Sequence, residues 1–366
     1  MKAGGTGMEA IETIEVIEAV GGGDLRRVVR ALPEPGAGEV RLRVAWVGVN
    51  HLDRMIAEET LPAPVALPRV PGGEVSGIVE ALGAGVDASL LGQRAVIAPY
   101  LFCGRCDRCA AGRETVCRRG DILGLGVDGG YADAVLAPAT NVVRVPDGVP
   151  LDVAAALPLA AATAHHMLFD RARLGLGEWV LIVGVGGGVA SAALRLARLA
   201  GARVIAASRS EAKLARARED GAEVVVRLEE DGRGLGRAVR SATEGRGADV
   251  VVDPLGALYW REDVQSLGRG GRLVTCGAYA GRDGVTDIWL TFAKELSLLG
   301  AYGAARADVL SVLDLAARGV FEPVIADRLP LGRASEAHAR LRRAEVYGKL
   351  LLCPPHGAEA WAGGQA

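Results

Sequence analysis

Four cysteines lie in one short loop, at Cys103, Cys106, Cys109 and Cys117. Their spacing, C-x2-C-x2-C-x7-C, brings four thiolates together, and four thiolates satisfy tetrahedral zinc without leaving an open coordination position. A closed site of this kind stabilises structure and does not activate water. The spacing therefore predicts one structural Zn2+ ion per chain, and it indicates that this metal is not the catalyst.

A second candidate site is a glycine-rich turn that follows the apolar segment Trp179–Val183 and opens the amphipathic segment Val189–Ala200. Backbone N–H groups at such a strand-to-helix turn bind a pyrophosphate. The spacing Gly184-x-x-Gly187-x-x-Ala190 is a variant of the dinucleotide fingerprint. The predicted cofactor-binding residues of the turn are Gly184, Gly186, Gly187, Gly188 and Val189.

The residues after the next strand predict which dinucleotide binds. Enzymes that prefer NAD usually carry Asp or Glu there, which grips the ribose 2′-hydroxyl. This chain has Ser208 at that place, Arg209 beside it and Lys213 one turn further on. A hydroxyl and two cations attract a 2′-phosphate, so the sequence favours NADP(H). The alternative is that both cations are solvated surface charges.

Two domains are expected to position these sites, because 366 residues exceed one typical domain. Residues 9–146 predict short strands broken by Gly and Pro turns, such as Glu39–Val47 and Val75–Ala81, and therefore a barrel-like β domain. From residue 157 apolar strands alternate with helices, which predicts a doubly wound parallel sheet in an α/β fold. The expected domains are 1–156 with 302–366 returning to it, and 157–301.

Composition excludes some partners. Basic and acidic residues number 42 and 44, and aromatic residues are few, so nucleic acid is not an expected partner. The sequence shows no signal peptide and no apolar run of about 20 residues, which predicts a cytoplasmic protein without a membrane partner.

This order of domains and motifs resembles the medium-chain dehydrogenase/reductase superfamily over nearly the whole chain. The supporting segments are Pro71–Gly77, the cysteine loop, Gly184–Ala190, Gly247–Asp253 and Gly348-Lys349. The resemblance implies a GroES-like catalytic domain, a Rossmann domain, and a cleft where nicotinamide meets substrate. It also maps the family's structural zinc onto the four cysteines.

The family's catalytic zinc has no matching ligands here. In zinc alcohol dehydrogenases its ligands are two Cys and one His, and the corresponding places hold Asn50, Leu159 and Gly73. Glu74 remains, but one carboxylate does not hold zinc in a three-ligand open site. Without a Lewis acid, hydride transfer suits a substrate that already spreads the arriving charge. The sequence therefore resembles the quinone oxidoreductase and enoyl reductase branch, with structural zinc only.

In this reading the predicted catalytic residues are Asn50, His51, Asp53 and Thr163. Asn50 would donate a hydrogen bond to the developing enolate oxygen, and His51 would donate a hydrogen bond or a proton. Asp53 would orient a loop or the ribose, and Thr163 would lie near the nicotinamide. By its place in the family fold, the cofactor would also contact Cys276, Gly277 and Lys349. Each of these side chains also has a purely structural interpretation.

The leading hypothesis is an NADPH-dependent reductase of an activated C=C bond (enone, enal or enoyl thioester) or a quinone. One alternative is an alcohol dehydrogenase or carbonyl reductase with atypical ligands, and another is an NADPH-binding sensor or structural protein with little turnover. The segment Met55–Val70 has few polar side chains, which suits an apolar small-molecule substrate. A homodimer is expected, because the family pairs subunits through the edge strand that corresponds to Leu296–Ala301.

Overall fold

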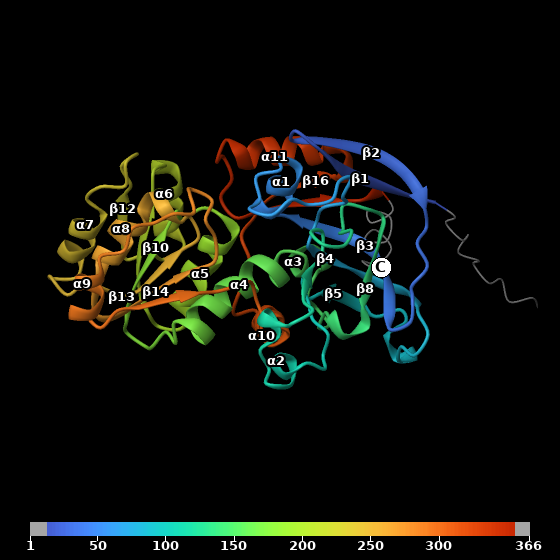
Figure 1. Cartoon of the computed structure of the whole chain (residues 1–366), viewed down its shortest axis with the longest axis horizontal. Coiled ribbons are helices and arrows are strands. Elements are labelled where there is room, and N and C mark those ends of the chain that lie inside the picture. The colour runs from blue at the N-terminus through green and yellow to red at the C-terminus, as the bar shows by residue number, and fades with distance from the viewer. Residues whose placement is uncertain (1–12, 356–366) are drawn as a thin grey trace, which may run out of the picture.

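The computed structural model describes residues 13–355, which form two lobes joined by one long helix (Figure 1). One lobe is built on a seven-stranded mixed sheet, and the other on a six-stranded parallel sheet. The GroES-like and Rossmann architectures expected from the sequence are therefore confirmed.

The seven-stranded sheet of the first lobe has the order β16-β17-β3-β4-β5-β9, and β8 also pairs with β3. Its longest strand, β3, alternates buried Val40, Leu42 and Val44 with the more exposed Arg41 and Arg43, as a strand with one face on a core should. The strands are β3 (Glu39–Val49), β4 (Glu74–Leu82), β5 (Arg94–Ile97), β8 (Ala134–Pro138), β9 (Val142–Arg144), β16 (Ile325–Pro330) and β17 (Lys349–Cys353).

Smaller elements complete this lobe. A hairpin of β1 (Thr13–Gly21) and β2 (Asp24–Ala31) covers one side, and α1 (His51–Ala57) follows β3 directly. The cysteine loop contains α2 (Asp107–Ala110) and is closed at its base by β6 (Tyr100–Leu101) paired with β7 (Asp121–Ile122).

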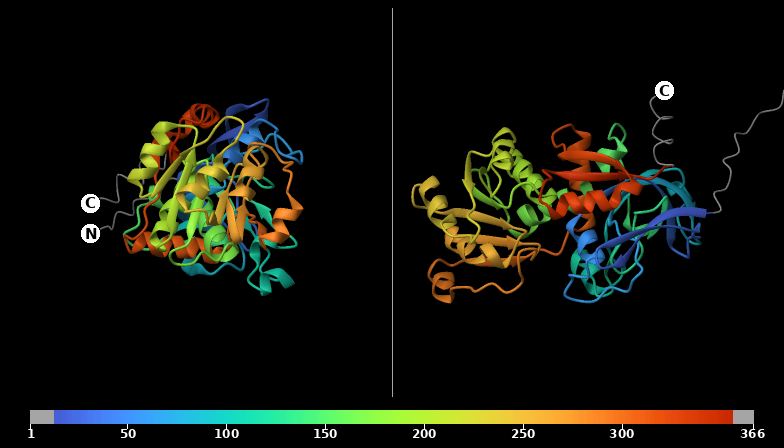
Figure 2. Two further views of the ribbon diagram at one scale, coloured as in Figure 1. Left: turned by 90° about the vertical axis from the view of Figure 1, so that its left-hand side faces the viewer. Right: turned by 90° about the horizontal axis from the view of Figure 1, so that it is seen from above.

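The parallel sheet of the second lobe has the order β12-β11-β10-β13-β14-β15. Figure 2 shows this lobe, coloured from green to orange, in two further views. Its central strand β10 (Trp179–Val183) is wholly buried, with Val180 and Ile182 on one face and the other three residues on the opposite face. The other strands are β11 (Arg203–Ser208), β12 (Val224–Arg227), β13 (Ala248–Asp253), β14 (Leu267–Thr275) and β15 (Ser297–Gly300).

Helices bury both faces of this sheet, which is why its strands are apolar throughout. α5 (Gly188–Leu199) and α6 (Glu211–Glu219) pack on one face, and α7 (Leu235–Ala242) and α8 (Ala257–Ser266) on the other. The short helix α9 (Ile288–Ala293) precedes the edge strand β15.

The helix that joins the lobes runs through α3 (Leu151–Ala154) and α4 (Ala162–His165), with π-helical turns at Leu157–Ala161 and His166–Arg171. It is long and apolar enough to cross a membrane by length and composition, but most of it is buried inside the fold. His165 and His166 both bond through Nδ1 to the Asp308 carboxylate, at 2.7 and 2.9 Å. These contacts fix the linking helix to α10 (Arg306–Ala317).

The C-terminal segment returns to the first lobe. Val309, Val312 and Leu313 of α10 share a core with the linking helix and with Val96 and Val143 of the first lobe. β16 and β17 then complete the return, and β17 pairs with β3 so that Leu352 faces Val47. α11 (Ala334–Arg342) lies beside these strands in the same lobe (Figure 1).

Candidate functional site

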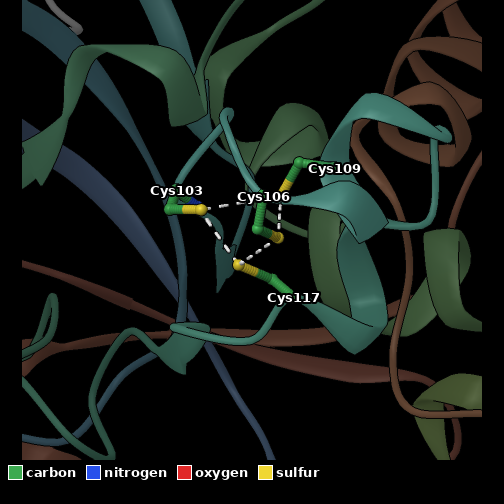
Figure 3. Close-up of side chains that lie close together, drawn as sticks. All are labelled: Cys103, Cys106, Cys109 and Cys117. Carbon is green, nitrogen blue, oxygen red and sulfur yellow. Dashed lines mark hydrogen bonds between the residues drawn. The ribbon is translucent and has the colours of Figure 1, made fainter.

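The four loop cysteines converge on one point, as Figure 3 shows. Their sulfur atoms all lie within 4.8 Å of one another, and neighbouring pairs are 3.5 Å (Cys106–Cys109), 3.9 Å (Cys106–Cys117) and 4.0 Å (Cys103–Cys109) apart. Zinc bonded to four sulfurs at about 2.3 Å sets them roughly 3.8 Å apart. The cysteines therefore fit one tetrahedral zinc ion.

The pKa values of these thiols also favour a bound cation. The backbone N–H of Arg105 lowers the pKa of Cys103 to about 5, which favours its thiolate. Burial and the adjacent Cys106 and Cys117 raise the pKa of Cys109 to about 12. Four thiolates this close together repel one another, so all four ionise only when a metal ion neutralises their charge. Among residues 13–355, this is the single His, Cys, Asp and Glu group with metal-ligating spacing.

A buried polar cluster lies where the two lobes meet. Lys349 opens β17 and Glu74 opens β4, and the two flank Asn50 because both strands pair with the end of β3. The Lys349 ammonium lies 2.7 Å from Glu74 Oε2 and donates to Asn50 Oδ1 at 2.6 Å and to the Val49 carbonyl at 2.8 Å. All three side chains are buried.

Glu74 is satisfied on both oxygens. Its Oε1 accepts the backbone N–H groups of Leu159 and Ala160 at 2.9 and 3.0 Å. These donors lie in the first π-helical turn of the linking helix, where the wider winding releases N–H groups from the ordinary helical pattern. The carboxylate therefore connects the linking helix, β4 and the returning strand β17.

This cluster corrects the predicted role of Asn50. Its Nδ2 donates to the Gly48 carbonyl at 3.1 Å and to Glu74 Oε2 at 3.2 Å, so both amide hydrogens have acceptors within the protein. The flipped amide would place its NH2 against the Lys349 ammonium, which charge forbids. Asn50 holds the ion pair in place, and it has no hydrogen left for a substrate oxygen.

Lys349 also differs from its predicted role as a cofactor contact. Its three ammonium hydrogens are used by Asn50, Val49 and Glu74. Only its aliphatic stem reaches the glycine turn, since a Cβ on Gly188 would lie 2.7 Å from Lys349 Cδ. Its charge serves Glu74 and not a phosphate.

The same region does not fit a catalytic metal ion. A Cβ on Gly73 would lie 2.8 Å from the Leu123 carbonyl oxygen and 3.5 Å from Leu159 Cδ1, so neighbouring atoms close the position of a second ligand. Leu159 offers no donor atom, and the Glu74 carboxylate is already paired with a cation. The donor set that an open zinc site needs is missing.

Asp53 has a structural role. Its carboxylate accepts the N–H groups of Asn50 and Gly72 at 2.7 and 3.0 Å, and the Tyr131 hydroxyl at 3.4 Å. Burial raises the pKa of Asp53 to about 6. The first bond caps α1, and the second fixes the loop before β4. Of its two predicted roles, this geometry matches loop orientation.

His51 lies on the cofactor side of the cluster. Burial, then the charges of Arg54, Lys349 and Lys213, lower the pKa of His51 to about 4, so its ring is neutral at pH 7. The ring lies 4.7 Å from that of Tyr279, and Nδ1 has no partner within residues 13–355.

Thr163 lies at the start of α4. Its hydroxyl is buried and has no hydrogen-bond partner of good geometry in the described part of the chain. The neighbouring phenol is Tyr100, whose hydroxyl contacts it. The sequence reading did not identify Tyr100. The available signal was an aromatic residue three positions before the first zinc cysteine.

The glycine turn has the shape of a pyrophosphate cradle. Gly184 and Gly186 have φ values of +70° and +129°, and Gly187 is the N-cap of α5 with no side-chain cap. A Cβ on Gly187 would meet no atom within 4 Å, so space is open above the helix N-terminus. A dinucleotide phosphate fits this space, and the residues that would hold it are Gly187, Gly188 and Val189.

The predicted 2′-phosphate residues occupy two places. Ser208 ends β11 and is buried, while Arg209 is exposed and no ion pair is recorded for it within residues 13–355. Lys213 lies over the turn itself, because a Cβ on Gly186 would be 2.5 Å from Lys213 Cδ. Burial lowers the pKa of Lys213. Lys213 is thus nearer to the pyrophosphate position than to the ribose.

Cys276 and Gly277 follow β14 at the same edge of the sheet. Burial, helped by Asp253, raises the pKa of Cys276 to about 12, so its thiol is not a nucleophile at neutral pH. A Cβ on Gly277 would lie 2.6 Å from the Pro254 carbonyl oxygen. Both residues shape the wall of the cofactor position.

Comparisons with known proteins agree with this fold. Two family models match, "Alcohol dehydrogenase GroES-like domain" over residues 36–147 and "Zinc-binding dehydrogenase" over residues 188–318. An alcohol dehydrogenase of Geobacillus stearothermophilus is 33% identical over 87% of this chain and 93% of its own length. The fold and these two matches are those of the zinc-binding dehydrogenase family. The chain belongs to the medium-chain dehydrogenase/reductase superfamily, a family of oxidoreductases.

Other relatives carry different activities in their names. The crystal structure of an NAD-dependent alcohol dehydrogenase superposes with a TM-score of 0.86 at 37% identity, over 93% of this chain and 99% of that one. An acryloyl-coenzyme A reductase of Sulfurisphaera tokodaii is 27% identical over 88% of this chain and 94% of its own. The superfamily includes both alcohol oxidation and enoyl reduction.

The zinc lobe gives a direct prediction. Cys106→Ser should lose the bound zinc and lower the unfolding midpoint by roughly 5–15 °C, because metal-binding energy is also folding energy. Metal analysis and differential scanning calorimetry measure the two effects. Cys353→Ser, which alters a thiol outside the lobe, should change neither. A Cys106→Ser protein that keeps a full zinc ion would contradict the assignment.

Proposed function

We propose that the protein is an NADPH-dependent reductase that delivers hydride to an activated C=C bond (enone, enal or enoyl thioester) or a quinone, without a catalytic metal. The observation that carries the proposal is the Lys349–Glu74–Asn50 cluster. It fills the family's metal position with an ion pair whose hydrogen-bonding atoms are all used.

The chemistry of the substrate follows from this cluster. Alcohol oxidation needs a Lewis acid to stabilise an alkoxide. A conjugated carbonyl or a quinone spreads the charge of the arriving hydride over several atoms, and hydrogen-bond donors suffice to stabilise it. A pocket without an open metal site therefore favours conjugated substrates.

The residues where the two lobes meet would have different roles in binding the cofactor and the substrate. The glycine turn and the start of α5 would hold the cofactor's phosphates, with His51 and Lys213 beside them. NADPH would supply the hydride. Thr163, at the start of the buried helix α4, would face the position between cofactor and substrate and would orient the reacting groups.

Two alternatives remain testable. The alcohol dehydrogenase names of several relatives favour an alcohol dehydrogenase or carbonyl reductase with atypical ligands. A binding protein with little turnover is the other. The test is to follow loss of reduced-nicotinamide absorbance with cyclohexenone, crotonyl-coenzyme A and benzoquinone, before and after treatment with a zinc chelator.

We expect NADPH oxidation with at least one conjugated substrate, and the same rate after removal of any metal outside the cysteine lobe. Chelation that abolishes activity while the cysteine zinc remains would favour the alcohol dehydrogenase alternative. NADPH binding without turnover across the panel would favour the binding protein.

The cofactor preference rests on Ser208 and Arg209. Arg209→Ala should raise KM for NADPH about 10- to 100-fold and change KM for NADH little, because a charge-assisted hydrogen bond to the 2′-phosphate contributes about 1.5–3 kcal/mol. Steady-state kinetics with both cofactors provide the measurement. Arg237→Ala, at an exposed arginine of α7, is the matched control. Equal effects of Arg209→Ala on both cofactors would remove the NADPH assignment.

We also propose a homodimer formed through the edge of the parallel sheet. β15 is the last strand of that sheet, and an unpaired strand edge invites pairing with a second copy. Beside it α9 exposes Ile288, Trp289 and Phe292 to 77%, 73% and 58%, and Val285 nearby to 82%. Apolar side chains gathered in this way are typical of a subunit interface.

Trp289→Asp should therefore convert the protein from dimer to monomer, because it places a charge within the apolar interface. Size-exclusion chromatography with light scattering measures the mass. Leu176→Asp changes another exposed apolar residue, 85% exposed and outside this surface, and should leave the mass unchanged. A wild-type monomer would refute the interface.

A further inference from the structure

Tyr100 is held in a defined position between the two lobes. Its ring lies directly on Gly303, where a Cβ would be 1.8 Å from Tyr100 Cζ and Cε2, so only glycine leaves room for it. Its backbone carbonyl accepts the Asn141 amide at 3.0 Å, and the Tyr302 ring packs edge-on at 5.4 Å. The ring is thus fixed from both lobes.

The Tyr100 phenol lies close enough to the polar cluster to be affected by the charge of Glu74. Burial raises the pKa of this phenol well above its usual value, and the neighbouring Cys276 and Glu74 raise it further. Contact with the Thr163 hydroxyl opposes the shift. The phenol therefore keeps its proton across the neutral range. Thr163 Oγ1, which is buried, has no other partner within residues 13–355. The two hydroxyls lie near each other but form no hydrogen bond of good geometry, so both can bond to a ligand.

The other donors at this position are committed elsewhere. The amide of Asn50 and the ammonium of Lys349 bond within the protein. His51 faces the charges of Lys213 and Lys349, on the side of the phosphate cradle. Tyr100 lies near Glu74, Cys276 and Thr163. A substrate carbonyl beside Thr163 would therefore meet the phenol.

We propose that the Tyr100 hydroxyl donates a hydrogen bond to the carbonyl oxygen of a conjugated substrate and then supplies the proton that completes its reduction. This inference rests on the proposed function, and it identifies the proton donor that the proposed reduction requires. It also defines the substrate class as one with a carbonyl conjugated to the reduced double bond.

The electron and proton balance is as follows. Bound NADPH would supply the hydride. When the β-carbon gains it, the π electrons of the C=C bond move toward the carbonyl oxygen and give an enolate, whose negative charge the Tyr100 O–H stabilises. The O–H bond then breaks, its proton passes to the enolate oxygen to give an enol, and a phenolate remains. Water returns a proton to that phenolate through the Thr163 hydroxyl. The enol tautomerises in water, gaining a proton at the α-carbon and losing the one on oxygen, and the product is the saturated carbonyl compound.

The test compares two variants that act on Tyr100 differently. Tyr100→Phe removes only the hydroxyl, and should lower kcat with cyclohexenone about 100- to 1,000-fold. Gly303→Ala keeps the hydroxyl but displaces the ring, and should cause a loss of the same kind. Tyr302→Phe alters the adjacent, exposed phenol and should retain the wild-type rate.

Two binding measurements separate catalysis from folding and from the cofactor. The Kd of NADPH in the absence of substrate should be unchanged in Tyr100→Phe. The affinity for cyclohexanone, a saturated carbonyl that is not reduced at C=C, should fall about 10-fold, since one hydrogen bond is lost. Isothermal titration calorimetry measures both.

A Tyr100→Phe protein with wild-type kcat and cyclohexanone affinity would overturn the inference while leaving the proposed function intact. A similar loss in Tyr302→Phe would also overturn it, because it would assign the effect to packing. A wild-type enzyme that binds NADPH but reduces no conjugated carbonyl would refute both this inference and the enone, enal and enoyl part of the proposed function.

Discussion

The buried ion pair between Lys349 and Glu74 is the interaction on which the rest of the site depends. Separately, each charge would be costly in this interior, and removing one partner of such a pair typically costs about 3–5 kcal/mol. The pair is tolerated because Asn50 and the π-turn N–H groups of Leu159 and Ala160 satisfy the remaining positions. It connects β3, β4, β17 and the linking helix, and thereby sets how the returning C-terminal strand meets the other lobe.

The same interaction separates two kinds of metal site within one chain. The cysteine lobe keeps four sulfur ligands at zinc-binding distances, in a closed arrangement. At the family's catalytic position the ammonium of Lys349 provides a fixed positive charge, and Gly73 and Leu159 leave no ligand. A fixed ammonium with every hydrogen in use does not polarise a substrate. We propose that this task falls to neutral donors, the hydroxyls of Tyr100 and Thr163.

Much of this could be predicted from local sequence. Apolar runs such as Trp179–Val183 identified the strands, and the spacing of the cysteines identified the zinc lobe, because both signals lie within a few residues. The pairing of Lys349 with Glu74 depends on the register of strands far apart in the chain, which no local pattern encodes. The prediction that Asn50 donates to substrate was wrong for that reason: its hydrogens belong to partners that only the fold brings near.

Tyr100 was beyond prediction for a related reason. An aromatic residue at the end of a short strand ordinarily packs in a core, and its contact with Gly303 comes from the other lobe. The central claim is that the Lys349–Glu74–Asn50 cluster does not bind a metal ion. The most direct test is anomalous diffraction at the zinc edge, from crystals soaked in zinc. The account predicts one peak per chain, among the four cysteine sulfurs. A second peak within bonding distance of Glu74, with Lys349 displaced, would contradict it.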